Sequence, residues 1–266
     1  MTGISYVNET VNCVTGCTKV SEGCDNCYAL AMSYRLWKMV DPKYNGVSYC
    51  GFSGEGVNWT GRINFYIEPL RRVLKWRKPK RIFLNSMSDT FHPSVTDEQI
   101  KAMLDVIRQT PIHIYLLLTK RPERLKDFTF PDNVWLGVTV ENQAMADERI
   151  PLLLQTPAKV KWISVEPMLG EITARWAKWV DYKATIKAQG RIFHLEGLKR
   201  LDWVVIGCES GVNRRECKLE WVRSLVAQCT EAQVPVWVKQ LEINGKVVQD
   251  VSKFPADLQI REVPNG

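Results

Sequence analysis

VWLGVTVENQAMADERIPLLLQTPAKVKWISVEP, residues 134–167, contains two short and almost continuous apolar runs separated by a helical pattern. The runs at 134–140 and 160–166 are rich in β-branched and aromatic residues, which is typical of strands buried on both faces. The segment at 142–154 has apolar residues at the spacing of a helix. A buried strand, a helix and a second buried strand predict one βαβ unit of a parallel sheet.

The same alternation extends over most of the chain. Further apolar runs occupy residues 81–86, 112–119, 201–208 and 234–240, after a first short strand at 3–8. Helical patterns are found at residues 26–39, 66–78, 96–108, 122–125 and 219–232. We therefore predict an α/β fold, a partial, open βα barrel of TIM type with about six to seven parallel strands.

Polar residues follow the predicted strands, and their positions favour a barrel over an open doubly wound sheet. They lie at residues 85–89, 119–121, 139–142, 164–167, 209–211 and 239–240. The C-terminal ends of the strands of a βα barrel converge on one face, which is where such barrels carry their active sites. Ser88, Asp89, Asn142 and Ser210 are equally suited to capping a helix or starting a turn.

We expect one domain at residues 1–250 and a C-terminal extension at 251–266, since 266 residues with 45% hydrophobic content can bury a sizeable core. The glycine-rich residues 44–62 have no steady period and are expected to be irregular. An insertion at about 171–200 interrupts the alternation and mixes aromatic with basic residues. That composition suits base stacking with phosphate contact, or simple packing on the barrel.

Charge and hydropathy limit the partners and the compartment. The formal net charge is +7, which favours a polyanionic partner such as DNA or a nucleotide. There is no long apolar run and no basic segment followed by an apolar one near Met1, so we expect no membrane association and a cytoplasmic location. In a reducing compartment, closely spaced cysteines indicate metal or redox chemistry instead of disulfides.

Half of the eight cysteines lie in one loop, residues 13–28, directly after the first predicted strand. Cys13, Cys17, Cys24 and Cys27 are spaced C-x3-C-x6-C-x2-C. Three interpretations are open: a four-thiolate structural zinc site, an iron–sulfur cluster on three of the cysteines with one open iron, or a thioredoxin-type redox pair. Cys50 is either a further ligand or a small buried apolar residue.

The loop resembles the cluster loop of the radical S-adenosylmethionine superfamily, whose members bind a four-iron four-sulfur cluster through three cysteines. Nearly the whole chain is similar, more closely, to the often phage-encoded family named after gene products thirty-seven and sixty-eight. The similar residues are at 12–21, 23–24, 27–29, 85–89, 118–122, 136–141, 164–167, 209–211 and 238–240. The superfamily usually spaces its cysteines C-x3-C-x2-C, whereas this chain has C-x6-C-x2-C with Asn26 before the last cysteine.

This resemblance implies that Cys17, Cys24 and Cys27 ligate the cluster and that Cys13 does not. S-adenosylmethionine would chelate the fourth iron, and an external electron donor would reduce the cluster. Reductive cleavage would then give a 5′-deoxyadenosyl radical that abstracts hydrogen from the substrate. Taken together with the positive net charge, this favours a nucleic acid or nucleotide as the substrate that is modified or repaired. The alternative function is a zinc-stabilised nucleic-acid-binding protein without catalysis.

The resemblance also implies where S-adenosylmethionine binds. The methionine end is assigned to Asn85, Ser86, Ser88 and Asp89, with Lys120 for its carboxylate. The ribose hydroxyls are assigned to Thr139, Glu141, Ser164 and Glu166. Glu209 is expected to border the adenine or the substrate, and Lys120 and Glu166 are the candidate catalytic residues.

Overall fold

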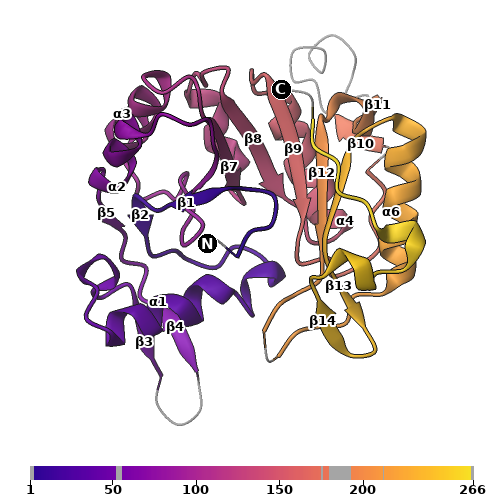
Figure 1. The fold of residues 1–266 in the computed structure, drawn as a ribbon, viewed down its shortest axis with the longest axis horizontal. Coiled ribbons are helices and arrows are strands. Elements are labelled where there is room, and N and C mark those ends of the chain that lie inside the picture. The colour runs from indigo at the N-terminus through magenta and orange to yellow at the C-terminus, as the bar shows by residue number, and fades with distance from the viewer. Residues whose placement is uncertain (1–2, 52–55, 175, 180–192, 212, 265–266) are drawn as a thin grey trace.

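The computed structural model describes residues 3–51, 56–174, 176–179, 193–211 and 213–264. Its centre is an eight-stranded sheet in the order β1-β6-β7-β8-β9-β12-β13-β14, curled into an open half-barrel (Figure 1). The strands are β1 (Glu9–Val11), β6 (Arg81–Leu84), β7 (Ile114–Thr119), β8 (Val134–Thr139), β9 (Val160–Val165), β12 (Trp203–Gly207), β13 (Val236–Ile243) and β14 (Lys246–Val248). Neighbours from β1 to β13 pair in parallel, and β14 pairs antiparallel to β13. The predicted α/β fold with an open, partial barrel sheet is confirmed.

Three long helices connect the strands: α3 (Asp97–Arg108), α4 (Gln143–Gln155) and α6 (Leu219–Ala232). Helix α3 begins with a capping box, in which the Thr96 hydroxyl accepts from the Gln99 amide and the Gln99 side chain accepts from the Thr96 amide. The side chain of Asn142 caps α4 by accepting a hydrogen bond from the Met145 amide. All three helices lie within two residues of their predicted bounds. In α3 and α4 the cap and the apolar period agree, whereas α6 begins without a side-chain cap.

The core has two layers, one on each face of the sheet. Strand residues such as Leu136 and Ile163 pack with the helices in the outer layer. Alternate residues face the concave side, where Trp135, Trp162 and Trp203 form an inner aromatic cluster. Their rings meet edge-on or tilted, with centroids 5.5–5.9 Å apart. This cluster fills the N-terminal half of the concave side and leaves space at the C-terminal ends of the strands.

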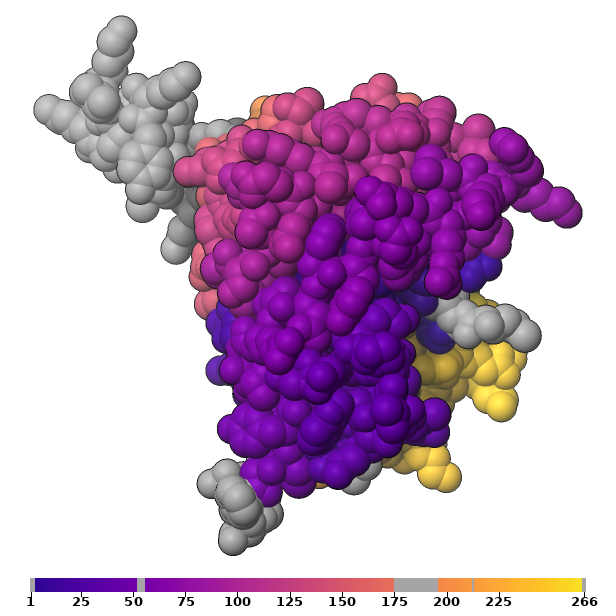
Figure 2. Space-filling view, turned by 90° about the vertical axis from the view of Figure 1, so that its left-hand side faces the viewer, coloured from indigo at the N-terminus to yellow at the C-terminus, as the bar shows by residue number. Residues whose placement is uncertain are grey.

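The N-terminal part of the chain packs at those C-terminal ends. It contains α1 (Tyr28–Lys38), the hairpin of β3 (Ser48–Cys50) and β4 (Val57–Trp59), and the pair of β2 (Val14–Thr15) with β5 (Asn64–Phe65). Figure 1 shows α1 and the hairpin beside the strand ends, and Figure 2 shows the indigo and purple N-terminal residues in close contact with the magenta residues of the sheet and its helices. The expectation of irregular chain over 44–62 was wrong for Ser48–Cys50 and Val57–Trp59, which form this hairpin.

Two further predicted elements differ. The first strand is Glu9–Val11 and not residues 3–8, whose Tyr6 and Val7 are buried in the inner cluster. The single helix expected at 66–78 is a short α2 (Glu68–Arg71) followed by a 3-10 helix (Arg72–Lys75), although Leu70 and Val73 are still fully buried.

The remaining predicted regions lie around β10–β13. Within the expected insertion, β10 (Trp176–Trp179) pairs antiparallel with β11 (Phe193–Glu196), and residues 175 and 180–192 lie outside the described part. The C-terminal extension pairs with the start of β13: Val238 donates to the Ile260 carbonyl and Glu262 to the Val236 carbonyl. In the described residues there is no helix with the length and apolar content needed to span a membrane.

Candidate active site

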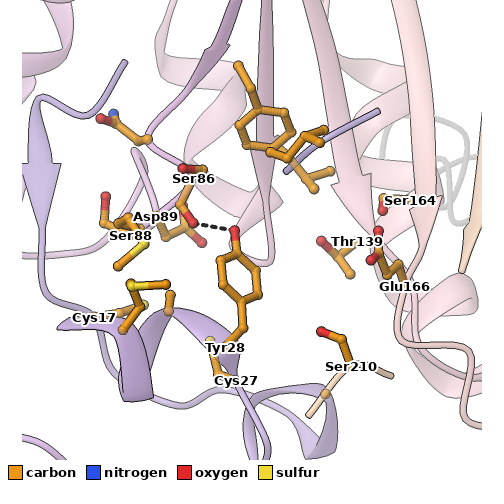
Figure 3. A pocket seen from close by; sticks show the side chains of 18 of the residues that line it. Cys17, Cys27, Tyr28, Ser86, Ser88, Asp89, Thr139, Ser164, Glu166 and Ser210 are labelled. Carbon is orange, nitrogen blue, oxygen red and sulfur yellow. Dashed lines mark hydrogen bonds between the residues drawn. The ribbon is translucent and has the colours of Figure 1, made fainter. Parts of the chain in front are cut away.

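A cavity of about 660 Å³ lies at the C-terminal ends of the strands. Its size is in the range of small-molecule and cofactor sites. Residues assigned from the sequence line it from both sides, as Figure 3 shows for several of them. They are Cys17, Cys24, Cys27, Asn85, Ser86, Ser88, Asp89, Lys120, Thr139, Ser164, Glu166 and Glu209. Glu141 is the one assigned residue that is fully buried behind this wall.

Strand alternation explains why polar side chains reach the cavity. Side chains two residues apart on a strand share a face. Trp135 faces the concave side, so Thr139 four residues later faces it as well. Trp162 also faces the concave side, so Ser164 and Glu166, two and four residues later, face it as well.

The cysteine loop separates Cys13 from the other three cysteines. Cys13 is fully buried in the outer core layer, and burial raises its pKa to about 12. Cys17, Cys24 and Cys27 line the cavity, with Cys27 at the N-cap position of α1. A four-thiolate zinc site would therefore require the Cys13 thiol to leave the core. Cys50 lies exposed on β3 and does not line the cavity.

Arg121 and Asp89 hold the first part of the loop. Asp89 accepts hydrogen bonds from the Thr119 hydroxyl (2.7 Å), the Lys120 amide (3.1 Å) and the Arg121 guanidinium (3.0 Å). Arg121 donates in turn to the carbonyl and hydroxyl of Thr18 at 2.9 and 2.8 Å and approaches the Cys17 sulfur at 3.8 Å. The buried Asp89 carboxylate thus orients the guanidinium that fixes Cys17.

Glu141 holds the middle of the loop. Its Oε1 accepts from the Ser21 hydroxyl at 2.6 Å and pairs with Lys120 Nζ at 3.0 Å, and its Oε2 accepts from Arg149 at 2.9 Å. Burial raises the pKa of Glu141, but the two cations outweigh burial and hold the pKa below the ordinary value of 4.5. Gly23 approaches so closely that a Cβ there would overlap the Glu141 side chain.

Glu209 and Arg215 hold the end of the loop. Glu209 accepts from the Asn26 side chain at 3.0 Å and from Arg215 at 2.6 and 3.1 Å. Arg215 also donates to the Glu22 carbonyl at 2.9 Å. The loop is therefore fixed at three places by ion pairs that come from the ends of β7, β8 and β12.

The thiols of the loop are close enough to influence each other. Burial raises the pKa of Cys17 to about 11, and Asp89 and Cys27 raise it while Arg121 lowers it. Burial also raises the pKa of Cys27, against its helix-start hydrogen bonds and Lys120, and Cys24 raises it further. The raised pKa values keep the Cys17 and Cys27 thiols neutral, and a metal that binds them as thiolates must displace their protons.

Three thiol donors, Cys17, Cys24 and Cys27, lie on one wall of the cavity. Within the described ranges, no three His, Cys, Asp or Glu side chains are positioned to hold one metal ion. An iron–sulfur cluster places its thiolates on different irons, so its ligands need not converge on one point. Three cysteines on one cavity wall, with a cationic Arg121 beside Cys17, fit such an anionic cluster.

The residues expected at the methionine end of the cofactor mostly support the loop. Asn85 accepts from the amides of Cys13 and Val14 at 2.8 and 3.0 Å, and Ser88 donates to the Val14 carbonyl at 2.7 Å. Ser86 donates to the Asn12 side chain at 3.3 Å. These side chains line the cavity, yet their polar atoms are already engaged.

Sequence reasoning did not assign Arg121, Lys239, Arg215 or Tyr28 to the site. Arg121 and Lys239 stood in predicted strand ends, and Lys239 could have been found because it lies two residues after the inward-facing Trp237. Arg215 gave no such signal, since it lies in irregular chain. Tyr28 directly follows the last loop cysteine and projects into the cavity (Figure 3).

A family model with the description "Protein of unknown function (DUF5131)" matches residues 1–258. No curated protein and no solved structure matches the chain.

Proposed function

The chain belongs to the DUF5131 family, and from its site we propose that it is a radical S-adenosylmethionine enzyme that modifies or repairs a nucleic acid or nucleotide. The half-barrel is then a partial barrel of TIM type with its site at the usual face. One observation carries the proposal: Cys17, Cys24 and Cys27 line the cavity whose opposite wall holds Thr139, Ser164 and Glu166, while Cys13 is in the core.

Three cysteines would hold a four-iron four-sulfur cluster, with one iron left for the cofactor. When bound, the cluster and S-adenosylmethionine would supply one-electron radical chemistry. The chain itself orients the reactants and limits water. Its ion pairs at Arg121, Glu141 and Glu209 fix the loop before any ligand arrives, which lowers the cost of positioning.

The wall opposite the cysteines has free hydrogen-bonding groups. Thr139 and Ser164 are register partners on β8 and β9, with residue exposures of 4% and 1%. Neither hydroxyl has a hydrogen-bond partner among the described residues. Two adjacent hydroxyls can donate to and accept from a ribose diol, so we assign them to the ribose of S-adenosylmethionine.

Lys120 is suited to the carboxylate of the methionine end. Its ammonium pairs with Glu141 at 3.0 Å, which leaves two of its three donors for a ligand. Glu166, on the same side of the cavity as the two hydroxyls, is assigned to contact with the substrate (Figure 3).

The test is cofactor cleavage. Protein purified and reconstituted with iron and sulfide under anaerobic conditions is reduced and incubated with S-adenosylmethionine, and the products are measured by mass spectrometry. The wild type and Cys13→Ala should release methionine and 5′-deoxyadenosine. Cys17→Ala, Cys24→Ala and Cys27→Ala should fall to background. Cluster-loaded wild type that releases neither product contradicts the proposal.

A further inference from the structure

Glu166 and Lys239 form an ion pair on the cavity wall, and within the described part of the chain neither side chain hydrogen-bonds to the cysteine loop. Glu166 directly follows β9, and Lys239 lies in β13, with β12 between them. The Lys239 ammonium donates to Glu166 Oε1. Gly207 on β12 leaves the space for this pair, because a Cβ there would be 3.2 Å from Glu166 Cγ and Cδ.

The pair has unused hydrogen-bonding capacity directed at the cavity. Both residues line it, and their side chains are 18% and 15% exposed. Glu166 Oε2 has no partner among the described residues, and the Lys239 ammonium uses one of its three donors. An acceptor and a donor therefore stand next to each other, and a ligand that satisfies both removes the cost of leaving them unpaired.

Tyr28 adds an aromatic surface to the same cavity. Its hydroxyl donates to the Ser86 carbonyl at 2.6 Å, which fixes the ring, and the residue is still 51% exposed. In Figure 3 the ring lies between the cysteine side and the Thr139–Glu166 side. Met32, one helical turn further along α1, also lines the cavity and is 41% exposed. A fixed aromatic ring beside a flexible thioether suits a flat, apolar ring face.

We propose that this wall binds an unpaired nucleobase, with its hydrogen-bonding edge on Glu166 and Lys239 and its face on Tyr28. The inference rests on the proposed function and names the substrate class of that cavity. A nucleobase presents a donor next to an acceptor on its Watson–Crick edge, which matches the carboxylate and the ammonium. Because that edge is occupied in a duplex, the base has to come from a free nucleoside, a single strand or a flipped position.

The test is equilibrium binding to the anaerobically purified protein, measured by calorimetry. The probes are uridine, 3-methyluridine, a single-stranded oligonucleotide and the matching duplex. Uridine or the single strand should bind, and the duplex should bind more weakly. The methyl group removes the ring donor, so 3-methyluridine should bind about tenfold or more weakly than uridine. This comparison uses the wild-type protein and does not depend on how a variant folds.

Variants of Glu166 and Lys239 test whether these two side chains bind the base. Glu166→Gln and Lys239→Met should each weaken binding about tenfold, since each removes a charged hydrogen-bond partner. Lys246→Met removes the same charge from an exposed position at the start of β14, outside the cavity, and should leave binding unchanged. Tighter binding of uridine than of the single strand would show that the base comes from a free nucleoside. Tighter binding of the single strand would show that it comes from a polynucleotide.

The proposal is overturned if neither uridine nor the single strand binds, if uridine binds and 3-methyluridine binds equally well, if the duplex binds best, or if both cavity variants keep wild-type affinity. Iron and sulfide are measured on the same samples. Protein without a cluster that binds uridine through Glu166 would count against the proposed cofactor alone. Cluster-loaded protein without base binding would count against the nucleobase wall alone.

Discussion

Glu141 is a buried carboxylate that positions other residues of the candidate site. It contacts Lys120, Arg149 and the Ser21 hydroxyl, so it connects β8 to the cysteine loop and to a cavity-lining lysine. From the sequence it was assigned to a ribose hydroxyl, and its complete burial behind the wall favours a positioning role instead. Removing one partner of a buried ion pair is costly because the remaining charge stays desolvated.

Glu141→Gln should lower the free energy of unfolding by about 3 kcal/mol at neutral pH, since two cations lose their counter-charge. The pKa of Glu141 is lowered in the folded protein, so its stabilisation is complete above the unfolded value of 4.5 and is lost as the pH falls through the folded value. Urea denaturation of both proteins should therefore show a difference that shrinks below pH 4.5.

The matched control is Asp257→Asn, which removes the carboxylate of the exposed Arg223–Asp257 pair. That change should leave the free energy of unfolding nearly unchanged, because both charges of the pair are exposed to solvent. A Glu141→Gln effect that stays equally large through acid pH would show that the lost shape, and not the lost charge, causes the destabilisation.

At the level of elements, the cysteine loop depends on strand ends that are distant in sequence. Arg121 follows β7, Glu141 follows β8 and Glu209 follows β12, and each contacts a different part of residues 17–26. The spacer between Cys17 and Cys24 is therefore fixed, and its Ser21 and Gly23 are the residues that meet Glu141. The length of the spacer allows the loop to make this contact with Glu141.

Gly23→Ala should displace the loop, because the new methyl group would overlap the Glu141 side chain, which is held by two cations. We expect a lower iron content after anaerobic purification and a lower melting temperature. Gly170→Ala is the control, since no atom lies within 4 Å of the added Cβ. Equal iron content in Gly23→Ala and Gly170→Ala would show that the contact with Glu141 does not position the ligands.

At the scale of the whole molecule, the buried strands could be predicted from the apolar period. The face that carries the candidate site could be predicted from the polar residues at the strand ends. Six of the strands, β6 to β9 with β12 and β13, lie where apolar runs predicted them. β1 was misplaced because Tyr6 and Val7 look like strand residues but fill the bottom of the barrel. An apolar period cannot distinguish those two uses of an aromatic residue.

The site was predictable only in part for a similar reason. Asn85 and Ser88 have side chains that suit either a ligand or the backbone, and here they hydrogen-bond the backbone of the cysteine loop. Arg215 could not be assigned, because its contact with Glu209 depends on how irregular chain crosses the loop. Thr139 and Ser164 could be, since strand alternation decides which way they point.

The most direct test of the central claim is metal analysis of the anaerobically purified wild type together with its cysteine variants. The account predicts iron and sulfide near four of each per chain, with visible cluster absorption. Cys13→Ala should keep them, while Cys17→Ala, Cys24→Ala and Cys27→Ala should each lose them. One zinc per chain without cluster absorption, or a cluster that survives all three of those substitutions together, would contradict it.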